Sequence, residues 1–231
     1  MGTICEIPSV QVPLGPSLLS EFTFFSHTIS LYQGDLSEEN VDAIVIMNDP
    51  LLKNAFSSTK NIINRGGEKI KDELNELRAT VDHFDFGMAV YTVGGELYAN
   101  YIFNVIVPDW NGFENDCEGI LRECVENSLR LCGKLRINSI SFPILSCKEN
   151  NFPKNLCAET MVKTIKEYLE VEKEGGLIIR LISNENPNVR TFKNSLDKIF
   201  MGNMKLKTGG SSSELNNSGA SLNNYRGLAI S

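Results

Sequence analysis

Two short apolar runs constrain the fold of this chain more than any other feature. Residues 43–47 and 139–144 are rich in β-branched and large apolar side chains, and amphipathic helical patterns follow both. Apolar runs of this length are typical of strands buried on both faces, which occur mainly in parallel sheets covered by helices. The sequence therefore predicts an α/β fold, a three-layer α/β/α sandwich with a mixed, largely parallel central sheet.

The other predicted elements continue this alternation. Strands are expected at residues 88–93, 101–107 and 177–182, and residues 22–26 and 29–32 form either a strand pair or one bent strand. Helices are expected at 60–77, from the N-cap Asp116 to 132, at 154–169 and at 189–199. Ligands of such sheets bind beyond the carboxyl ends of the strands, which places a site at the loops after Val45, Ile144 and Ile182.

The composition divides the chain into one folded domain and two tails. Residues 1–20 are rich in Pro, Ser and Gly and lack a period, so we expect a disordered leader. Residues 203–231 are rich in Gly, Ser and Asn, and we expect a disordered tail there. The domain is predicted over residues 21–202, and 42% hydrophobic content is enough for its core.

Charge and hydropathy exclude two classes of partner. The net charge is −7 with 22 Lys and Arg, which argues against a broad nucleic-acid surface. No apolar run approaches the roughly 20 residues of a membrane helix, and residues 1–6 lack the pattern of a secretory signal. We therefore expect no membrane partner and an intracellular location, cytoplasmic and/or nuclear.

The cysteine pattern predicts neither a metal site nor a cofactor. The six cysteines form no CxxC pair, and neither His27 nor His83 lies beside one. Cys124 and Cys132 share the apolar face of a predicted helix, which is typical of buried reduced thiols. Cys147 lies in a suspected ligand loop, but no histidine is near it in sequence to activate it. No catalytic residue is assigned.

Five short motifs follow one another along the chain. They are Gly34-Asp35-Leu36, Asp42-Ala43-Ile44-Val45, Gly66-Gly67, Tyr101-Ile102 with Pro108, and Ser139-Ile140-Ser141-Phe142-Pro143. In this order they resemble the macrodomain family, whose members bind ADP-ribose, over about residues 29–200. The stretches 152–157 and 183–187 look most like the macrodomains of vertebrate poly-ADP-ribose polymerases that carry several in tandem.

The ligand loops depart from the family pattern. The family usually reads Val-Asn-Ala-Ala-Asn after its second strand, whereas Val45 is followed here by Ile-Met-Asn and then Asp49, which replaces the asparagine needed by hydrolases of the family. The glycines that give backbone N–H groups access to a diphosphate are replaced at residues 55–57, where side chains should crowd the phosphates. In the second loop Ser-[Ser/Thr]-Gly becomes residues 146–148, and the usual histidine of the neighbouring strand is Asn104.

Three candidate ligand residues belong to the adenine side or to the loop that closes over it. Asp35 resembles the adenine-reading aspartate of the family, and its alternative role is a helix or turn cap. Phe152 matches an aromatic residue that closes over the ligand, or it packs the loop onto the next helix. Asn184 flanks the expected adenine pocket, although its segment is also an ordinary turn.

Four further candidates belong to the ribose and phosphate side. Asp49 is either a residual contact to the distal ribose or a turn residue before a proline. Ser146, Cys147 and Lys148 form the altered second loop, where the lysine either brings a positive charge towards a diphosphate or is only solvated. Any remaining nucleotide binding should therefore be led by the adenosine half.

The resemblance implies three functions. The first is a weakened, non-catalytic binding module for ADP-ribose or ADP-ribosylated protein. The second is a macrodomain without ligand that acts as a scaffold for protein partners, which the lost glycines favour. The third is an ADP-ribosyl hydrolase, which the replaced asparagines and glycines disfavour.

Overall fold

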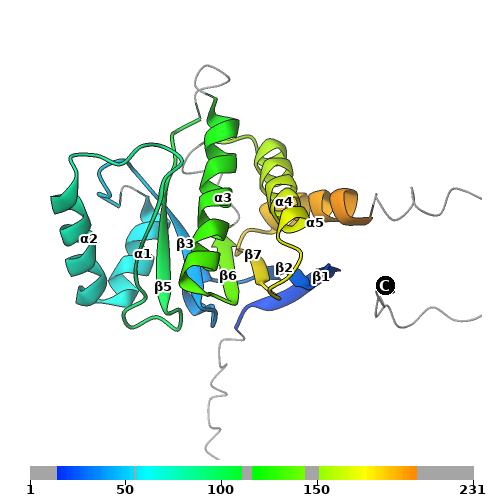
Figure 1. Cartoon of the computed structure of the whole chain (residues 1–231), viewed down its shortest axis with the longest axis horizontal. Helices are drawn as coiled ribbons and strands as arrows, with labels where there is room; N and C mark the ends of the chain where they lie inside the picture. The colour runs from blue at the N-terminus through cyan, green and yellow to red at the C-terminus, as the bar shows by residue number, and fades with distance from the viewer. Residues whose placement is uncertain (1–14, 55, 111–115, 144–150, 202–231) are drawn as a thin grey trace, which may run out of the picture.

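A computed structural model describes residues 15–54, 56–110, 116–143 and 151–201 of the chain. Strands and helices alternate along most of it (Figure 1). The strands are β1 (Ser17–Phe24), β2 (His27–Gln33), β3 (Ala43–Asn48), β4 (Ala89–Val93), β5 (Tyr101–Ile106), β6 (Ser139–Pro143) and β7 (Ile178–Ser183). The helices are α1 (Ser57–Gly66), α2 (Glu68–Thr80), α3 (Cys117–Leu135), α4 (Lys154–Val171) and α5 (Asn186–Leu196), with a 3-10 turn η1 (Leu36–Glu38) and a π-helical end η2 (Asp197–Met201).

All seven described strands form one mixed sheet in the order β1-β2-β7-β6-β3-β5-β4. The inner pairs β2–β7, β7–β6, β6–β3 and β3–β5 are parallel, and the outer strands β1 and β4 each pair antiparallel to their neighbour. Because β3 and β6 are nearly fully buried and pair directly, the two apolar runs meet at the centre of the sheet, as the sequence predicts.

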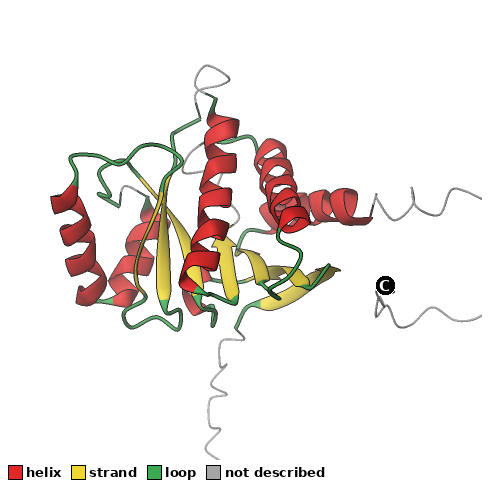
Figure 2. Cartoon of the chain, viewed as in Figure 1, coloured by secondary structure: helices red, strands yellow, loops and turns green. Residues whose placement is uncertain are grey.

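Helices cover both faces of the sheet, which gives the predicted three layers (Figure 2). Apolar side chains of α3, α4 and α5 pack with one face in a large core cluster that includes Leu121, Val162 and Phe192. Helices α1 and α2 cover the other face of β3, β5 and β4 in a second cluster, which includes Ile63 and Ile70. Each cluster buries one stripe of every covering helix, so the sheet is a wall between two apolar layers.

The motif residue Asp42 has a structural role at the amino ends of the strands. Its Oδ2 accepts hydrogen bonds from the backbone N–H groups of Asn138 and Ser139 at 2.9 and 3.0 Å, and from the Ser139 hydroxyl at 3.1 Å. The carboxylate therefore ties the start of β6 to the start of β3.

Asp116 caps α3 as predicted, because its side chain accepts a hydrogen bond from the backbone N–H of Gly119.

Two sequence-based boundaries are wrong. Strand β1 begins at Ser17, inside the predicted leader, because residues 17–20 pair with β2. The single helix predicted over 60–77 is two helices, which Gly67 separates at a φ of +84°. The backbone of the β4–β5 turn lies against this break, where the N–H of Glu96 donates to the carbonyl of Gly66 at 2.9 Å. The predicted tail 203–231 lies outside the described residues.

Candidate functional site

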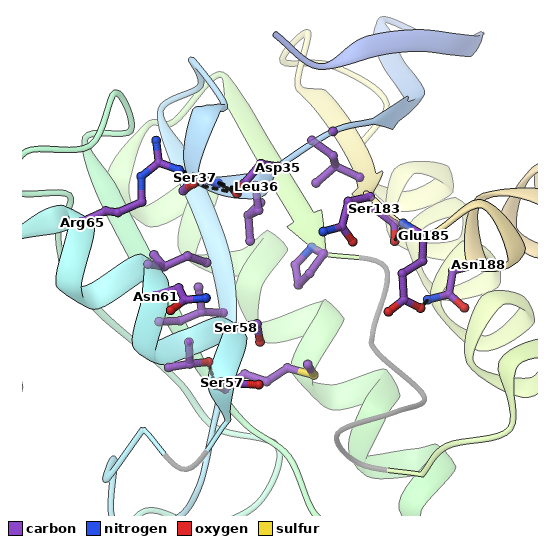
Figure 3. A pocket seen from close by; sticks show the side chains of 18 of the residues that line it. Asp35, Leu36, Ser37, Ser57, Ser58, Asn61, Arg65, Ser183, Glu185 and Asn188 are labelled. Carbon is purple, nitrogen blue, oxygen red and sulfur yellow. Dashed lines mark hydrogen bonds and ion pairs between the residues drawn. The ribbon is translucent and has the colours of Figure 1, made fainter. Parts of the chain in front are cut away.

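A cleft of about 890 Å³ opens at the carboxyl ends of the parallel strands, where the topology predicts a ligand site. Its floor is formed by residues in the last three positions of β3, β6 and β7, namely Ile46, Met47, Pro143 and Ile182. Helix α1 forms one wall, and the segment after β7 forms the opposite one (Figure 3). A volume of this size is typical of small-molecule pockets.

Helix α1 brings hydroxyl groups to one end of the cleft. Ser57, Ser58 and Thr59 occupy its first turn and line the cleft. The first N–H groups of a helix and its dipole favour an anion at this end. Phe56, which precedes the helix, packs against the main core and is not among the residues that line the cleft.

Asp35 lies at the other end of α1, on the turn that follows β2. Its Oδ1 accepts from the backbone N–H of Ser37 at 2.9 Å and from the Ser37 hydroxyl at 2.6 Å, so it caps η1. Its Oδ2 lies 3.6 Å from Nη1 of Arg65, which extends from the last turn of α1. The structure thus shows Asp35 as the cap of a turn, and the residue also lines the cleft.

The opposite wall consists of polar residues that join β7 to α5. Ser183, Asn184, Glu185 and Asn188 line the cleft there. Asn188 is only 3% exposed, and its Nδ2 donates to Oε2 of Glu185 at 2.9 Å. The amide therefore fixes the orientation of the Glu185 carboxylate (Figure 3). The candidate Asn184 also belongs to the lining of the cleft.

The loop after β3 is attached to the core, and Asp49 does not line the cleft. Asn48 is fully buried, and its Nδ2 donates to Asn104 at 3.2 Å and to Asn54 at 3.1 Å. Its Oδ1 accepts from the backbone N–H groups of Asp49 and Asn54. Asp49 in turn accepts the N–H of Leu51 at 2.9 Å, which is the geometry of a turn residue.

The remaining candidates are not brought into the described part of the cleft. Phe152 is 4% exposed and packs in the main core, where its ring centroid lies 5.3 Å from that of Trp110. This position fits the packing alternative better than an aromatic residue that closes over a ligand. Ser146, Cys147 and Lys148 lie outside the described residues.

The described lining carries little positive charge. Its ionisable side chains are Asp35, Glu185 and Arg65, and the arginine lies close to the carboxylates of Asp35 and Glu38.

Within the described ranges, no group of three or more His, Cys, Asp or Glu side chains could hold a metal ion, and no helix is long and apolar enough to cross a membrane. Burial raises the pKa of the thiols of Cys124 and Cys132 to about 12, so neither is a nucleophile at neutral pH.

Sequence reasoning missed the wall formed by α1. Ser58, Asn61 and Arg65 line the cleft from successive turns of this helix. Their spacing of three and four residues is that of one helical face. This polar stripe beside the apolar Ile62 and Ile63 was the available signal, but the same pattern is typical of a solvated helix face.

Comparisons with known proteins agree with this geometry. A family model of the Macro domain matches residues 57–161. An O-acetyl-ADP-ribose deacetylase of Shigella dysenteriae is 30% identical over 141 residues, which are 61% of this chain and 80% of that protein. The protein mono-ADP-ribosyltransferase PARP9 of Mus musculus is 28% identical over 177 residues, which cover 74% of this chain but only 20% of that protein.

A solved structure supports the same fold. A macrodomain of Oceanobacillus iheyensis with ADP superposes with a TM-score of 0.75 at 19% identity, and the match covers 82% of this chain and 100% of that one. At this identity the superposition shows the fold, the three-layer arrangement described above.

Proposed function

The chain belongs to the macrodomain family, and from this premise we propose that it is a non-catalytic binding module for ADP-ribose or for ADP-ribosylated protein, with weakened affinity. The observation that carries the proposal is the cleft at the carboxyl ends of the strands. Asp35 stands at one of its ends and the first turn of α1 at the other.

The length of α1 supports a ligand with a base and a phosphate group. Ser58 and Arg65 are seven residues apart on this helix, which corresponds to roughly 10 Å at the rise of an α-helix. The cleft thus offers a hydrogen-bond acceptor near one end of α1 and an anion-attracting helix terminus at the other. An adenine base joined through ribose to a diphosphate spans a comparable distance.

We propose that the adenosine half contributes most of the binding energy. Asp35, Asn184 and Glu185 line the cleft at the base end, where carboxylate and amide oxygens can accept hydrogen bonds from amino and hydroxyl groups. At the other end the glycines typical of the family are replaced by residues 55–57. Each lost charge-assisted bond to a phosphate costs roughly 1.5–3 kcal/mol, so two such losses bring a micromolar site to roughly millimolar affinity.

The arrangement after β3 supports the non-catalytic part of the proposal. The hydrolases of the family use an asparagine where this chain has Asp49, and that residue accepts a bond within its own turn. The neighbouring Asn48 is held in the core by contacts to Asn54 and Asn104. Neither side chain belongs to the lining of the cleft, where a hydrolase would need it to reach the distal ribose.

Titration calorimetry with three ligands tests the proposal. ADP-ribose should bind with a Kd of roughly 0.1 to 1 mM, AMP should retain most of that binding energy, and ribose 5-phosphate should bind more weakly than AMP. Heat from ribose 5-phosphate equal to that from ADP-ribose would contradict the adenosine-led mode. If none of the three ligands binds, the scaffold alternative replaces the proposal.

An activity assay tests separately the proposal that the chain is not a hydrolase. The protein is incubated with a mono-ADP-ribosylated protein beside an active macrodomain hydrolase as a positive control. We expect no release of ADP-ribose above the spontaneous rate. Release at the rate of the control would show that the chain is an enzyme and would overturn the non-catalytic assignment, whatever its affinity.

A further inference from the structure

The loop after β3, residues 49–54, is held in a strained conformation. Leu52 and Asn54 have positive φ angles of +51° and +57°. This left-handed region is sterically unfavourable for a bulky residue such as leucine, because its Cβ crowds the following carbonyl oxygen. Leu52 is nevertheless fully buried in the second core cluster. Strain of this kind persists only where neighbouring groups hold the backbone in place.

Arg78 of α2 holds the strained loop by one carbonyl group. Its Nε donates to the carbonyl oxygen of Leu52 at 3.1 Å, and its Nη2 donates to the same oxygen. Its Nη1 donates to Oδ1 of Asn75 at 2.7 Å, one turn earlier on α2. The planar guanidinium therefore binds the loop with two N–H groups, and its bond to Asn75 fixes its orientation.

The loop joins two segments that line the cleft at its anion-attracting end. Met47, two residues before the loop, and Ser57, three residues after it, belong to the lining, whereas residues 49–54 do not. Lys53 is exposed and lies between the two residues with positive φ. The observed conformation thus keeps a cation and several backbone N–H groups out of the lining, although the chain that carries them spans this end of the cleft.

We infer that Arg78 is a latch that holds the loop 49–54 away from the cleft, and that release of the Leu52 carbonyl lets the loop close over an anionic ligand with Lys53 towards its phosphate groups. This inference rests on the proposed function and adds a reason for the weakened affinity. Release relieves the backbone strain, whereas the burial of Leu52 opposes it, so the released state is a minor one in the wild type.

The charge of the described lining gives the released state its advantage. The lining has one cation, Arg65, which lies close to the carboxylates of Asp35 and Glu38. A cation already shared in this way offers little net charge to a phosphate group. The loop supplies a second cation only after release, and the apparent affinity falls with the fraction of molecules in the released state.

Hydrogen exchange tests the latch without any ligand. Arg78→Ala should speed exchange at the backbone amides of Leu52 and Asn54 at least tenfold, because the bonds of these amides open with the loop. Arg78→Lys, which keeps the charge but not the two-pronged donor, should have an intermediate effect. Amides of β5 are the internal reference, since a general loss of stability would speed their exchange as well. Unchanged exchange at Leu52 and Asn54 in Arg78→Ala would overturn the latch.

Calorimetry tests the closure over phosphate. Arg78→Ala should bind ADP-ribose roughly fivefold more tightly, and it should bind adenosine, which has no phosphate, as the wild type does. Lys53→Ala alone should change the affinity for ADP-ribose by less than about twofold, but it should remove most of the gain when combined with Arg78→Ala. Arg130→Ala is the matched control, since it removes a partly exposed arginine of α3 that pairs with Glu126. It should change neither exchange at the loop nor affinity.

The outcomes separate this inference from the proposed function. If Arg78→Ala speeds exchange at the loop but does not tighten ADP-ribose, the closure is wrong and the binding function stands. If the gain in affinity persists without Lys53, the role of the lysine is wrong. If neither the wild type nor Arg78→Ala binds ADP-ribose, the proposed function fails and the closure fails with it, whatever the exchange rates are.

Discussion

The turn after β2 and the loop after β3 both leave the carboxyl ends of parallel strands, which β7 and β6 separate in the sheet, yet they have opposite roles. In the first, residues 34–38, the side chain of Asp35 is half-exposed and lines the cleft. In the second, residues 49–54, Leu52 is fully buried in the core, and its carbonyl accepts hydrogen bonds from Arg78. The N–H of Phe84 also donates to the carbonyl of Pro50 at 2.8 Å.

The two segments differ in what their polar groups bond to. The turn after β2 presents a carboxylate to the cleft. In the loop after β3, backbone groups bond to Asn48, Arg78 and Phe84. A loop held by such bonds contributes to stability and has little freedom to close on a ligand.

Asn48→Ala should show the largest effect, and it should be an effect on stability. The change leaves the buried Asn104 amide and the backbone N–H groups of Asp49 and Asn54 without their partner, which costs about 2–4 kcal/mol of unfolding free energy. Urea denaturation measures it, with the exposed Asn194→Ala as a control that should change by less than about 0.5 kcal/mol. A loss below about 1 kcal/mol would mean that the loop is not attached to the core in this way.

Asp35→Ala should show the reverse pattern, with the larger effect on binding. Removal of the acceptor should weaken ADP-ribose at least tenfold, which corresponds to about 1.4 kcal/mol or more. The lost cap of η1 should cost about 1 kcal/mol of stability or less. Calorimetry measures the affinity, and the exposed Asp82→Ala serves as the control. Unchanged affinity in Asp35→Ala would place the ligand elsewhere.

Glu39, which directly follows the turn after β2, should make stability depend on pH. It is buried beside Arg180 at 3.2 Å, and burial raises the pKa of its carboxyl above the usual 4.5, while the arginine opposes this shift. Because the folded state then holds the proton more tightly, the contribution of Glu39 is fully present below pH 4.5 and is lost as pH rises through the raised pKa. The unfolding free energy of the wild type minus that of Glu39→Gln should therefore fall from pH 4 to pH 7, as measured by urea titrations. A difference that grows over this range would contradict the burial argument.

Asp49→Ala should have the smallest effect. Its carboxylate accepts a bond within its own turn and does not line the cleft, so ADP-ribose affinity should change by less than about twofold, while stability falls by about 1 kcal/mol or less. The same calorimetry measures it beside Asp35→Ala. A marked loss of affinity for ADP-ribose in Asp49→Ala would show that the loop after β3 takes part in binding, and it would contradict this prediction.

The sequence predicted the central sheet well because its strands carry their own pattern. The run at 43–47 is apolar throughout, and the run at 139–144 is apolar except for Ser139 and Ser141. A strand covered on both sides by helices buries such runs. The boundaries were less predictable. The break at Gly67 interrupts an apolar stripe that continues from Ile63 to Ile70, so hydrophobic periodicity alone predicts one helix. The start of β1 at Ser17 depends on pairing with β2, which no local pattern in a Pro- and Ser-rich segment reveals.

The sequence by itself determined the fold class, the order of the elements and the place of the cleft at the strand ends, because hydrophobic periodicity and motif order are local properties of the chain. Only the tertiary structure decided which polar side chains face that cleft. The Asp49 side chain accepts a hydrogen bond within its own turn, and Phe152 packs in the core. Arg65 and Asn188 line the cleft from helices that are distant in sequence. The direction of a polar side chain depends on which partners the fold brings within hydrogen-bond distance, and those partners are set by contacts between remote segments.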